Sequence, residues 1–143
     1  MKNVIFYSHD DCLLKDNGPS HPEKRERLQT LIKSIDQIND VLIIKKNAPL
    51  ADFQLISSVH PISYLKNMFD KIPVTGLATI EKEPFADTFL CKDSKNAILR
   101  SCGAGIAAAD DLFRNNNRIF CGVRPPGHHA EIKKFPFGFC FVN

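Results

Sequence analysis

The sequence lacks the features that would tie it to a membrane or to nucleic acid. It has no uninterrupted apolar run of the roughly 18 residues that a membrane-spanning helix needs. Its 19 basic and 16 acidic residues are scattered, so the formal net charge is only +3 and there is no basic cluster. The first residues, "MKNVIFYSHDDC", reach histidine and aspartate soon after a short apolar stretch, unlike a secretory signal. We therefore expect a cytoplasmic protein whose partners include neither nucleic acid nor membrane.

Paired cysteines are also missing. The chain has five cysteines, an odd number, and none of them forms a C-x-x-C pair. Their wide spacing argues against a disulfide scaffold and against a structural zinc ribbon. We expect most of them to be buried or nearly buried thiols. The five residues are Cys12, Cys91, Cys102, Cys121 and Cys140.

What is present is an alternation of strand and helix patterns. The chain has 143 residues, 43% of them hydrophobic and 24% charged, which is typical of one soluble globular domain. "NVIFY" (residues 3–7) predicts a strand that leads into a long polar loop. "SHPEKRERLQTLIKSI" predicts an amphipathic helix in which Ser20 and Glu23 have the spacing of a capping box. The expected apolar face of this helix comprises Leu28, Leu31, Ile32 and Ile35.

The middle of the chain continues this alternation. "VLII" (residues 41–44) is a continuous apolar run, which predicts a strand covered on both faces in a parallel sheet. Pro61 suits the first turn of a second amphipathic helix, after which residues 72–88 predict an irregular connection. The expected apolar face of this second helix comprises Ile62, Leu65, Phe69 and Ile72.

The last helix and strand complete an α/β pattern. "SKNAILRSCGAGIAAADDLF" predicts a buried helix whose small residues allow close packing, with Ser94 as its cap. Gly103 and Gly105 weaken its helical propensity. "RIFCGV" (residues 118–123) predicts the final strand. The order of elements predicts an α/β fold with a parallel sheet.

The most informative short segment is "RPPGHHA" (residues 124–130), which leaves the carboxyl end of that strand. Ligands of open parallel sheets bind beyond such ends. A Pro-Pro-Gly turn can direct His128 and His129 into one cleft, which a regular strand cannot do. Two imidazoles can divide the work of hydrolysis, one taking a proton from water while the other stays charged or donates a proton. The pair alone, without its sequence context, favours two surface histidines in a loop.

Four segments together resemble a known family. These are "DCLLKDNGPSHPEKRERL", "VHPISYL", "DTFLCKDSKNAILRSCGAGIAAADDLF" and "GVRPPGHHAEIKKFPFGFCFVN". In this order they closely resemble the N-terminal part of the zinc-dependent histone deacetylase family, especially its acetoin-utilisation and acetylpolyamine amidohydrolase-like members. The resemblance implies an arginase–deacetylase-like three-layer fold, of which residues 1–143 are the N-terminal portion of a single domain.

The resemblance also implies roles for five residues. His129 matches the general base and His128 its electrostatic or acid partner. Gly138 and Phe139 match the wall of a narrow tunnel that takes an acetyl-lysine-like chain, and Cys140 matches the position beneath that wall. A flat aromatic ring suits an apolar methylene stem. From composition alone, Phe139 is also compatible with a core residue and Cys140 with a buried thiol.

Four further residues are interpreted as structural. Segments like "HPE" and "VH" shape or pack the scaffold in this family, so we expect capping or packing roles for His21 and His60. Tyr64 and Arg124 are also expected to be structural, with Arg124 pairing a buried carboxylate near the site.

The zinc ligands of the family have no counterpart in this sequence. The resemblance places an Asp-x-His pair, a second aspartate and a carbonyl-polarising tyrosine downstream of "GFC", and none is found here. No residue is therefore assigned to a metal, although zinc is expected in the intact enzyme. We expect the intact enzyme to hydrolyse acetyl-lysine or acetylpolyamine, and the isolated chain, as a truncated part, to be inactive unless a C-terminal half complements it. The alternative is a non-catalytic α/β remnant or interaction module.

Overall fold

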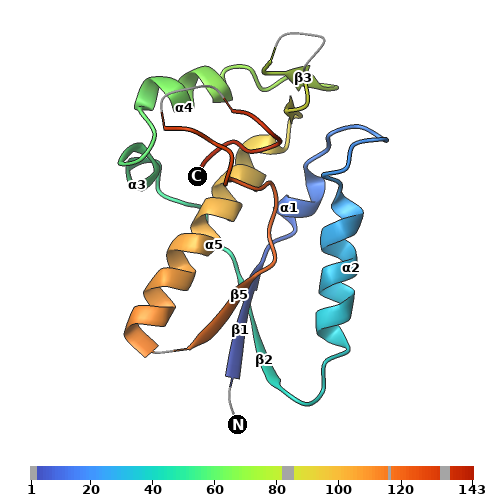
Figure 1. The fold of residues 1–143 in the computed structure, drawn as a ribbon, viewed down its shortest axis with the longest axis vertical. Coiled ribbons are helices and arrows are strands. Elements are labelled where there is room, and N and C mark those ends of the chain that lie inside the picture. Colours follow the sequence, from blue (N-terminus) through green and yellow to red (C-terminus); the bar gives the residue numbers. More distant parts are fainter. Residues whose placement is uncertain (1–2, 82–85, 116, 133–135) are drawn as a thin grey trace.

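A small parallel sheet forms the centre of the lower half of the molecule. The computed structural model describes residues 3–81, 86–115, 117–132 and 136–143. Its main sheet contains β1 (Asn3–Ser8), β2 (Leu42–Asn47) and β5 (Arg118–Cys121) in the order β2-β1-β5, all parallel. The central strand β1 therefore pairs with strands from two distant parts of the chain (Figure 1).

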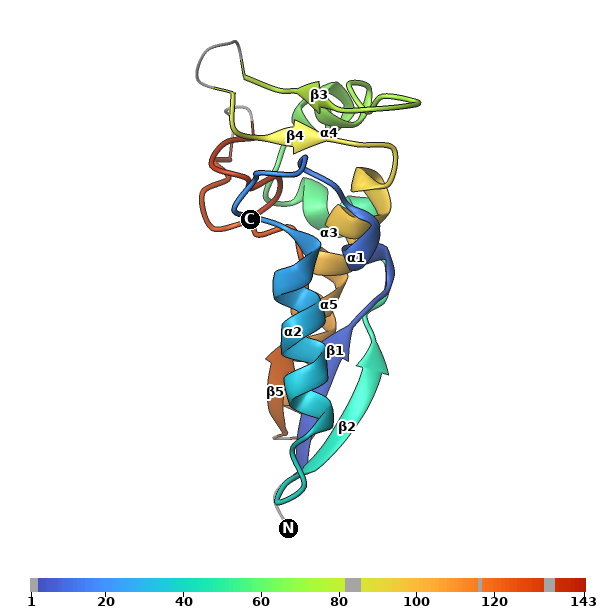
Figure 2. The same ribbon diagram turned by 90° about the vertical axis from the view of Figure 1, so that its right-hand side faces the viewer.

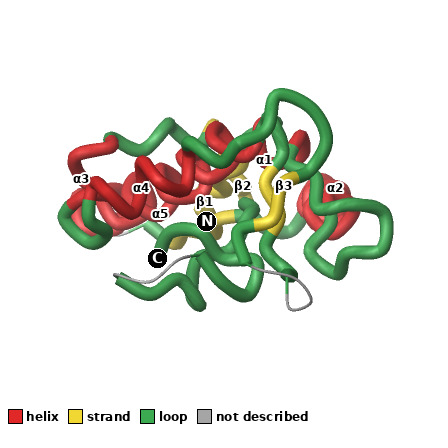
Figure 3. The backbone as a smooth tube through the Cα atoms, turned by 90° about the horizontal axis from the view of Figure 1, so that it is seen from above, coloured by secondary structure: helices red, strands yellow, loops and turns green. Residues whose placement is uncertain are grey.

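Helices cover both faces of this sheet. α5 (Ser94–Asn115) lies on one side and α2 (Arg25–Asp36) on the other, as seen from above in Figure 3. Because side chains alternate along a strand, Ile5 and Tyr7 pack toward α5, whereas Phe6 lies on the side of α2. This arrangement is the three-layer α/β fold with a parallel sheet that the sequence predicts.

The start of α2 differs from the prediction. The helix begins at Arg25, and Lys24 precedes it without a side-chain cap. Ser20 and Glu23 therefore do not form a capping box, because the Glu23 carboxylate binds Arg124 instead. The predicted apolar face is confirmed, since all four of its residues are buried or partly buried: Leu28, Leu31, Ile32 and Ile35.

The prediction that β2 is covered on both faces is wrong. The strand is present, but Leu42 and Ile44 are 51% and 39% exposed. β2 lies at the edge of the sheet, and α5 packs over β5 and β1. A run of apolar residues indicates a strand but does not say whether the strand is central.

Close packing of α5 depends on one glycine. The helix runs unbroken through Gly103 and Gly105. A side chain at Gly103 would collide with the carbonyl oxygen of Pro49, whereas Gly105 has open space around it. The Ser94 hydroxyl accepts a hydrogen bond from the Cys91 N–H at the start of the helix (2.8 Å). The predicted small-residue helix is confirmed, but Ser94 is its first residue and binds an N–H that precedes the helix, so it is not the cap that the sequence predicts.

The remaining elements lie beyond the carboxyl ends of the strands (Figure 2). They are α1 (Asp11–Leu14), α3 (Phe53–Ser57), α4 (Ile62–Phe69), and the antiparallel pair β3 (Ala78–Thr79) and β4 (Phe89–Leu90). This short pair replaces part of the expected irregular connection, of which residues 82–85 lie outside the described residues.

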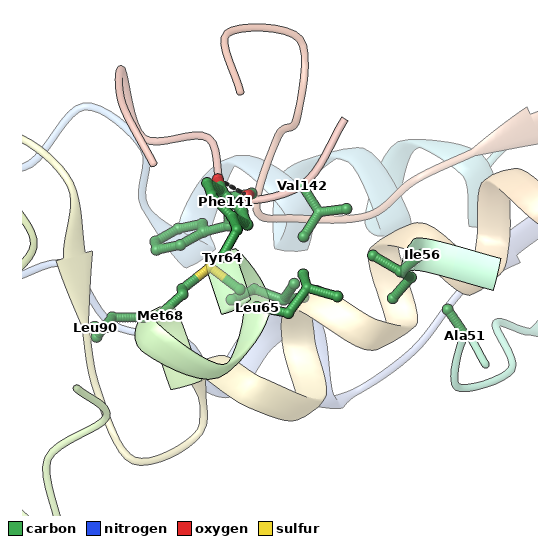
Figure 4. Close-up of a cluster of buried hydrophobic side chains, with 9 residues drawn as sticks. Ala51, Ile56, Tyr64, Leu65, Met68, Leu90, Phe141 and Val142 are labelled. Carbon is green, nitrogen blue, oxygen red and sulfur yellow. Dashed lines mark hydrogen bonds between the residues drawn. The ribbon is translucent and has the colours of Figure 1, made fainter. Parts of the chain in front are cut away.

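A buried cluster joins α3, α4, β4, α5 and the C-terminal segment (Figure 4). The predicted α4 helix is present, and Leu65 is buried as expected. Ile62, however, is 52% exposed, and Tyr64 and Met68 fill the core in its place. The complete cluster is Ala51, Ile56, Tyr64, Leu65, Met68, Leu90, Ile98, Phe141 and Val142. Within the described ranges, no helix combines the length and apolar character needed to cross a bilayer.

Candidate active site

The loop of residues 124–130, here called the histidine loop, begins with a buried arginine. The Arg124 guanidinium is almost fully buried and donates hydrogen bonds to the Cys12 and Lys15 carbonyl oxygens, each at 2.8 Å. It also donates to both carboxylate oxygens of Glu23, at 2.7 and 2.9 Å. The expectation that Arg124 pairs with a buried carboxylate is confirmed. Burial acts to raise the pKa of Glu23, but the bonds and charge of Arg124 hold it below its ordinary value.

Backbone contacts fix the rest of the histidine loop. The Ser101 hydroxyl of α5 donates to the Pro125 carbonyl (2.8 Å), and the Ala130 N–H donates to the Gly127 carbonyl (2.9 Å). Gly127 lies so close to the Val142 carbonyl oxygen that any side chain would collide with it. This position therefore needs glycine because the C-terminal segment passes directly beside the loop.

The two predicted catalytic histidines lie side by side. The His128 and His129 ring centroids are 4.4 Å apart, with an angle of 48° between the ring planes. His129 also meets the ring of Phe137 edge-on at 5.9 Å. The spacing agrees with the prediction that the Pro-Pro-Gly turn brings both rings together. Both residues are exposed, so the described residues do not enclose them in a cleft.

The predicted wall is a tight turn, here called the GFC turn (residues 137–140). Phe137 and Cys140 exchange backbone hydrogen bonds of 3.1 and 3.0 Å, and Gly138 and Phe139 have φ angles of 58° and 67°. Two positive φ angles between paired residues are typical of a type I′ hairpin turn. This conformation is strained for phenylalanine, and such strain persists only where surrounding contacts impose it. The Thr88 hydroxyl contributes by accepting the Phe139 N–H (3.2 Å).

The Phe139 ring packs against His21. Their centroids are 4.6 Å apart in an edge-to-face arrangement, and His21 meets Phe89 similarly at 5.6 Å. His21 Nδ1 accepts the Glu23 N–H (3.0 Å), which leaves Nε2 to donate to the Asp87 carbonyl (2.9 Å). His21 therefore packs the scaffold, as expected. Phe139 is partly exposed and lies outside both buried clusters formed by the described residues.

Cys140 is a buried thiol beside the histidine loop. It has no exposed surface, and burial raises the pKa of its thiol, opposed by a hydrogen bond from the His129 backbone N–H. Its burial agrees with the expectation of a buried thiol. The position beneath a tunnel wall stays a prediction. The catalytic and substrate-binding roles of the five predicted residues stay predictions.

His60 and Tyr64 hold the C-terminal segment. His60 is fully buried, stacks on Tyr64 with centroids 4.8 Å apart, and accepts the Asn143 N–H at Nε2 (3.0 Å). The Tyr64 hydroxyl donates to the Phe141 carbonyl at 2.6 Å, as Figure 4 shows. Both residues are structural, as predicted, and they keep residues 141–143 against the histidine loop.

Sequence reasoning missed a buried polar network next to Arg124. Lys15 is 1% exposed, donates to Asn17 and to the Phe89 carbonyl (3.2 Å), and has its pKa lowered to about 8 by burial. Asn17 in turn donates to the Glu23 carboxylate at 2.6 Å. Lys15 and Asn17 belong to a polar loop without periodicity, so no sequence signal marks them as buried. Only the "HPE" segment, which contains Glu23, pointed to this region.

The described residues provide no set of ligands for the zinc that the resemblance implies. Among residues 3–81, 86–115, 117–132 and 136–143, no group of three or more histidine, cysteine, aspartate or glutamate side chains could hold a metal ion. A catalytic zinc site needs three protein ligands. The described residues therefore do not fit this metal by themselves.

Comparisons with known proteins identify the family to which the chain belongs. The model of the histone deacetylase domain matches residues 21–143. Type-2 histone deacetylase 2 of Dictyostelium discoideum is 27% identical over 99% of this chain and 10% of its own length. A probable deacetylase of Archaeoglobus fulgidus is 29% identical over 98% of this chain and 38% of its own length.

The fold comparison agrees. The crystal structure of the HDA15 HD domain superimposes with a TM-score of 0.83 and 24% identity, over 99% of this chain and 40% of that one. The chain thus spans less than half the length of these relatives. Because the family model matches most of the sequence, the chain belongs to the histone deacetylase family.

Proposed function

We propose that these residues form the N-terminal portion of a zinc-dependent deacetylase domain that hydrolyses the acetyl-amide group of acetyl-lysine or of an acetylated polyamine. The observation that carries the proposal is the contact between the paired imidazoles and the strained GFC turn. His129 lies against Gly138, and the next residue, Phe139, is held in a conformation that costs free energy. Family membership supports the same chemistry.

In this proposal the two histidines divide the proton transfers. His129 takes a proton from the attacking water, and His128 stabilises the developing charge or donates a proton to the leaving amine. Rings 4.4 Å apart can act on the same small group of reacting atoms. Zinc, when bound, would supply a Lewis acid. The described residues supply no group of three donors by themselves, so other residues would have to provide at least part of its ligand set.

The GFC turn would guide the substrate stem. Phe139 offers a flat apolar face, and Gly138 keeps the wall thin beside His129. Cys140, a fully buried thiol, would lie beneath this wall. A methylene chain ending in an amide suits such a site, because its stem is apolar and its reacting end is polar.

A C-terminal half of a deacetylase domain is the proposed partner of this chain in a split arrangement. A groove of about 480 Å³ lies between α3 and α5, and its lining includes Leu55, Val59, Cys102 and Val142. Leu55 and Val59 are 54% and 44% exposed, which is costly in water. The same groove also favours the second candidate function, a non-catalytic interaction module.

The test is complementation. We would measure zinc content and hydrolysis of acetyl-lysine peptide and acetylated polyamine by this chain, alone and mixed with the C-terminal part of the Archaeoglobus fulgidus relative. We expect activity only in the mixture, lost in His129→Ala and kept in the matched control His9→Ala. Zinc binding and turnover by the 143-residue chain alone would overturn the proposal that the zinc ligands come from a separate C-terminal half. A stable mixed complex without turnover would favour the interaction module.

A further inference from the structure

We propose that Glu23 is a positioning residue for the predicted site, an inference that rests on the function proposed above. Glu23 fixes the loop between α1 and α2 (residues 15–24, here called the first loop) to the histidine loop. The first loop carries His21, which packs on Phe139, and the histidine loop carries His128 and His129. The placement of the histidine pair relative to the aromatic wall would therefore depend on one ion pair.

The ion pair has the geometry to set a position. Arg124 binds both oxygens of Glu23 through Nε and Nη2, and such a paired contact fixes orientation as well as distance. The two side chains are only 4% and 9% exposed, so salt and water screen them little. Arg124 also binds the carbonyl oxygens of Cys12 and Lys15. The guanidinium therefore binds both ends of the first loop, with Glu23 as its charged partner among the described residues.

A chain of direct contacts leads from Glu23 to the wall. Its backbone N–H holds Nδ1 of His21, whose ring meets the Phe139 ring edge-on at 4.6 Å. The Asn17 amide supports the Glu23 carboxylate from within the same loop. A shift of Glu23 would therefore move His21, and with it the aromatic ring of the proposed tunnel.

The contacts then return to the histidines. Phe139 follows Gly138, and a Cβ built on Gly138 would lie 3.2 Å from the ring atoms of His129. His129 belongs to the loop that Arg124 begins. The contacts thus form a closed ring that runs from Arg124 through Glu23, His21 and the GFC turn to His129. The Arg124–Glu23 pair is the buried ionic link in this ring.

The experiment compares Glu23→Gln with Asp36→Asn. Both replace a carboxylate by an amide within an ion pair, but Asp36 pairs with Lys45 on the surface, far along α2 from the site. NMR of the 143-residue chain would follow the nuclear Overhauser effects between the His129 ring and Gly138 Hα and between the His21 and Phe139 rings. We expect both signals to be lost, or to fall at least twofold, in Glu23→Gln. Asp36→Asn should keep them.

A conservative variant keeps the proposal falsifiable. Glu23→Asp retains the charge beside Arg124, and we expect it to fold and to restore part of both signals. Wild-type signals in Glu23→Gln would show that the pair adds stability without positioning the site. If neither variant folds while Asp36→Asn does, Glu23 is a determinant of the fold and the positioning role is wrong. These readouts do not require turnover, so the inference can fail while the proposed deacetylase function stands.

Discussion

The carboxylate of Glu23 and the guanidinium of Arg124 form a buried, bidentate ion pair, although the two residues are 101 positions apart in the sequence. One partner lies in the loop before α2, and the other follows the last strand of the sheet. This contact connects the first loop, whose His21 packs on Phe139, to the loop that carries His128 and His129. Removing one partner of a buried pair leaves the other charge without compensation, which typically costs about 3–5 kcal/mol of unfolding free energy.

Acid should weaken the fold through Glu23. Its carboxyl has a pKa below the ordinary value of 4.5, because Arg124, Lys15 and Asn17 outweigh the opposing effect of burial. A depressed folded-state pKa gives stability that is complete above 4.5 and is lost as the pH falls through the folded value. Urea unfolding between pH 3 and 7 would show a steeper acid loss for the wild type than for Glu23→Gln. Parallel curves for the two proteins would contradict this assignment.

Alkaline pH should act on Lys15 in the opposite sense. Burial lowers its pKa from 10.5 to about 8, so between these values the unfolded chain holds a proton that the folded chain has lost. The stability of the wild type relative to Lys15→Met should therefore rise from pH 7 to pH 10.5, by at most about 3 kcal/mol. The difference between the two proteins cancels the titration of cysteines and tyrosines. A difference that is flat or falling over this range would show that Lys15 titrates normally.

The two glycines of α5 should respond oppositely to alanine. Gly103→Ala would force a methyl group into the Pro49 carbonyl, and overpacking of this kind costs about 1–3 kcal/mol. Gly105 has no atom within 4 Å of the position of a Cβ, so Gly105→Ala should gain up to about 1 kcal/mol from helix propensity. Thermal unfolding of the two variants checks both signs. Equal effects would mean that α5 does not approach Pro49 closely.

Local patterns predicted elements well where no distant contact competed. The face of α2 and the small residues of α5 follow directly from spacing and side-chain size. The predicted start of α2 was wrong because the capping pattern of Ser20 and Glu23 is a local signal. In the folded chain the Glu23 carboxylate instead binds Arg124, a bidentate charged partner that is distant in the sequence. The exposure of β2 was also missed, because apolar runs carry no information on the order of strands in a sheet.

In the candidate site, too, local features could be predicted from the sequence and features that depend on distant contacts could not. The tandem histidines and the GFC segment were visible in the sequence, and the structure brings His129 against Gly138. The left-handed conformation of Phe139 could not be predicted, because it depends on the pairing of Phe137 with Cys140 and on the distant Thr88 hydroxyl. The burial of Lys15 likewise arises only after Asn17, Phe89 and Phe141 have come together around it.

The contact between Gly138 and His129 gives the most specific test of the site. Gly138 and Gly76 both have positive φ angles, 58° and 71°, so alanine at either position should cost a similar 1–2 kcal/mol of backbone strain. The methyl group of an alanine at position 138 would lie only 3.2 Å from the His129 ring, whereas the methyl group of an alanine at position 76 would have no atom within 4 Å. Gly138→Ala should therefore shift the imidazole NMR signals of His129, and Gly76→Ala should leave them in place at the same loss of stability. In a complemented, active assembly, Gly138→Ala should also reduce hydrolysis at least tenfold, because His129, the proposed general base, would be displaced from the attacking water. Unchanged His129 signals in Gly138→Ala would show that the GFC turn does not contact the histidine pair. The proposed site depends on this contact, so that result would contradict it.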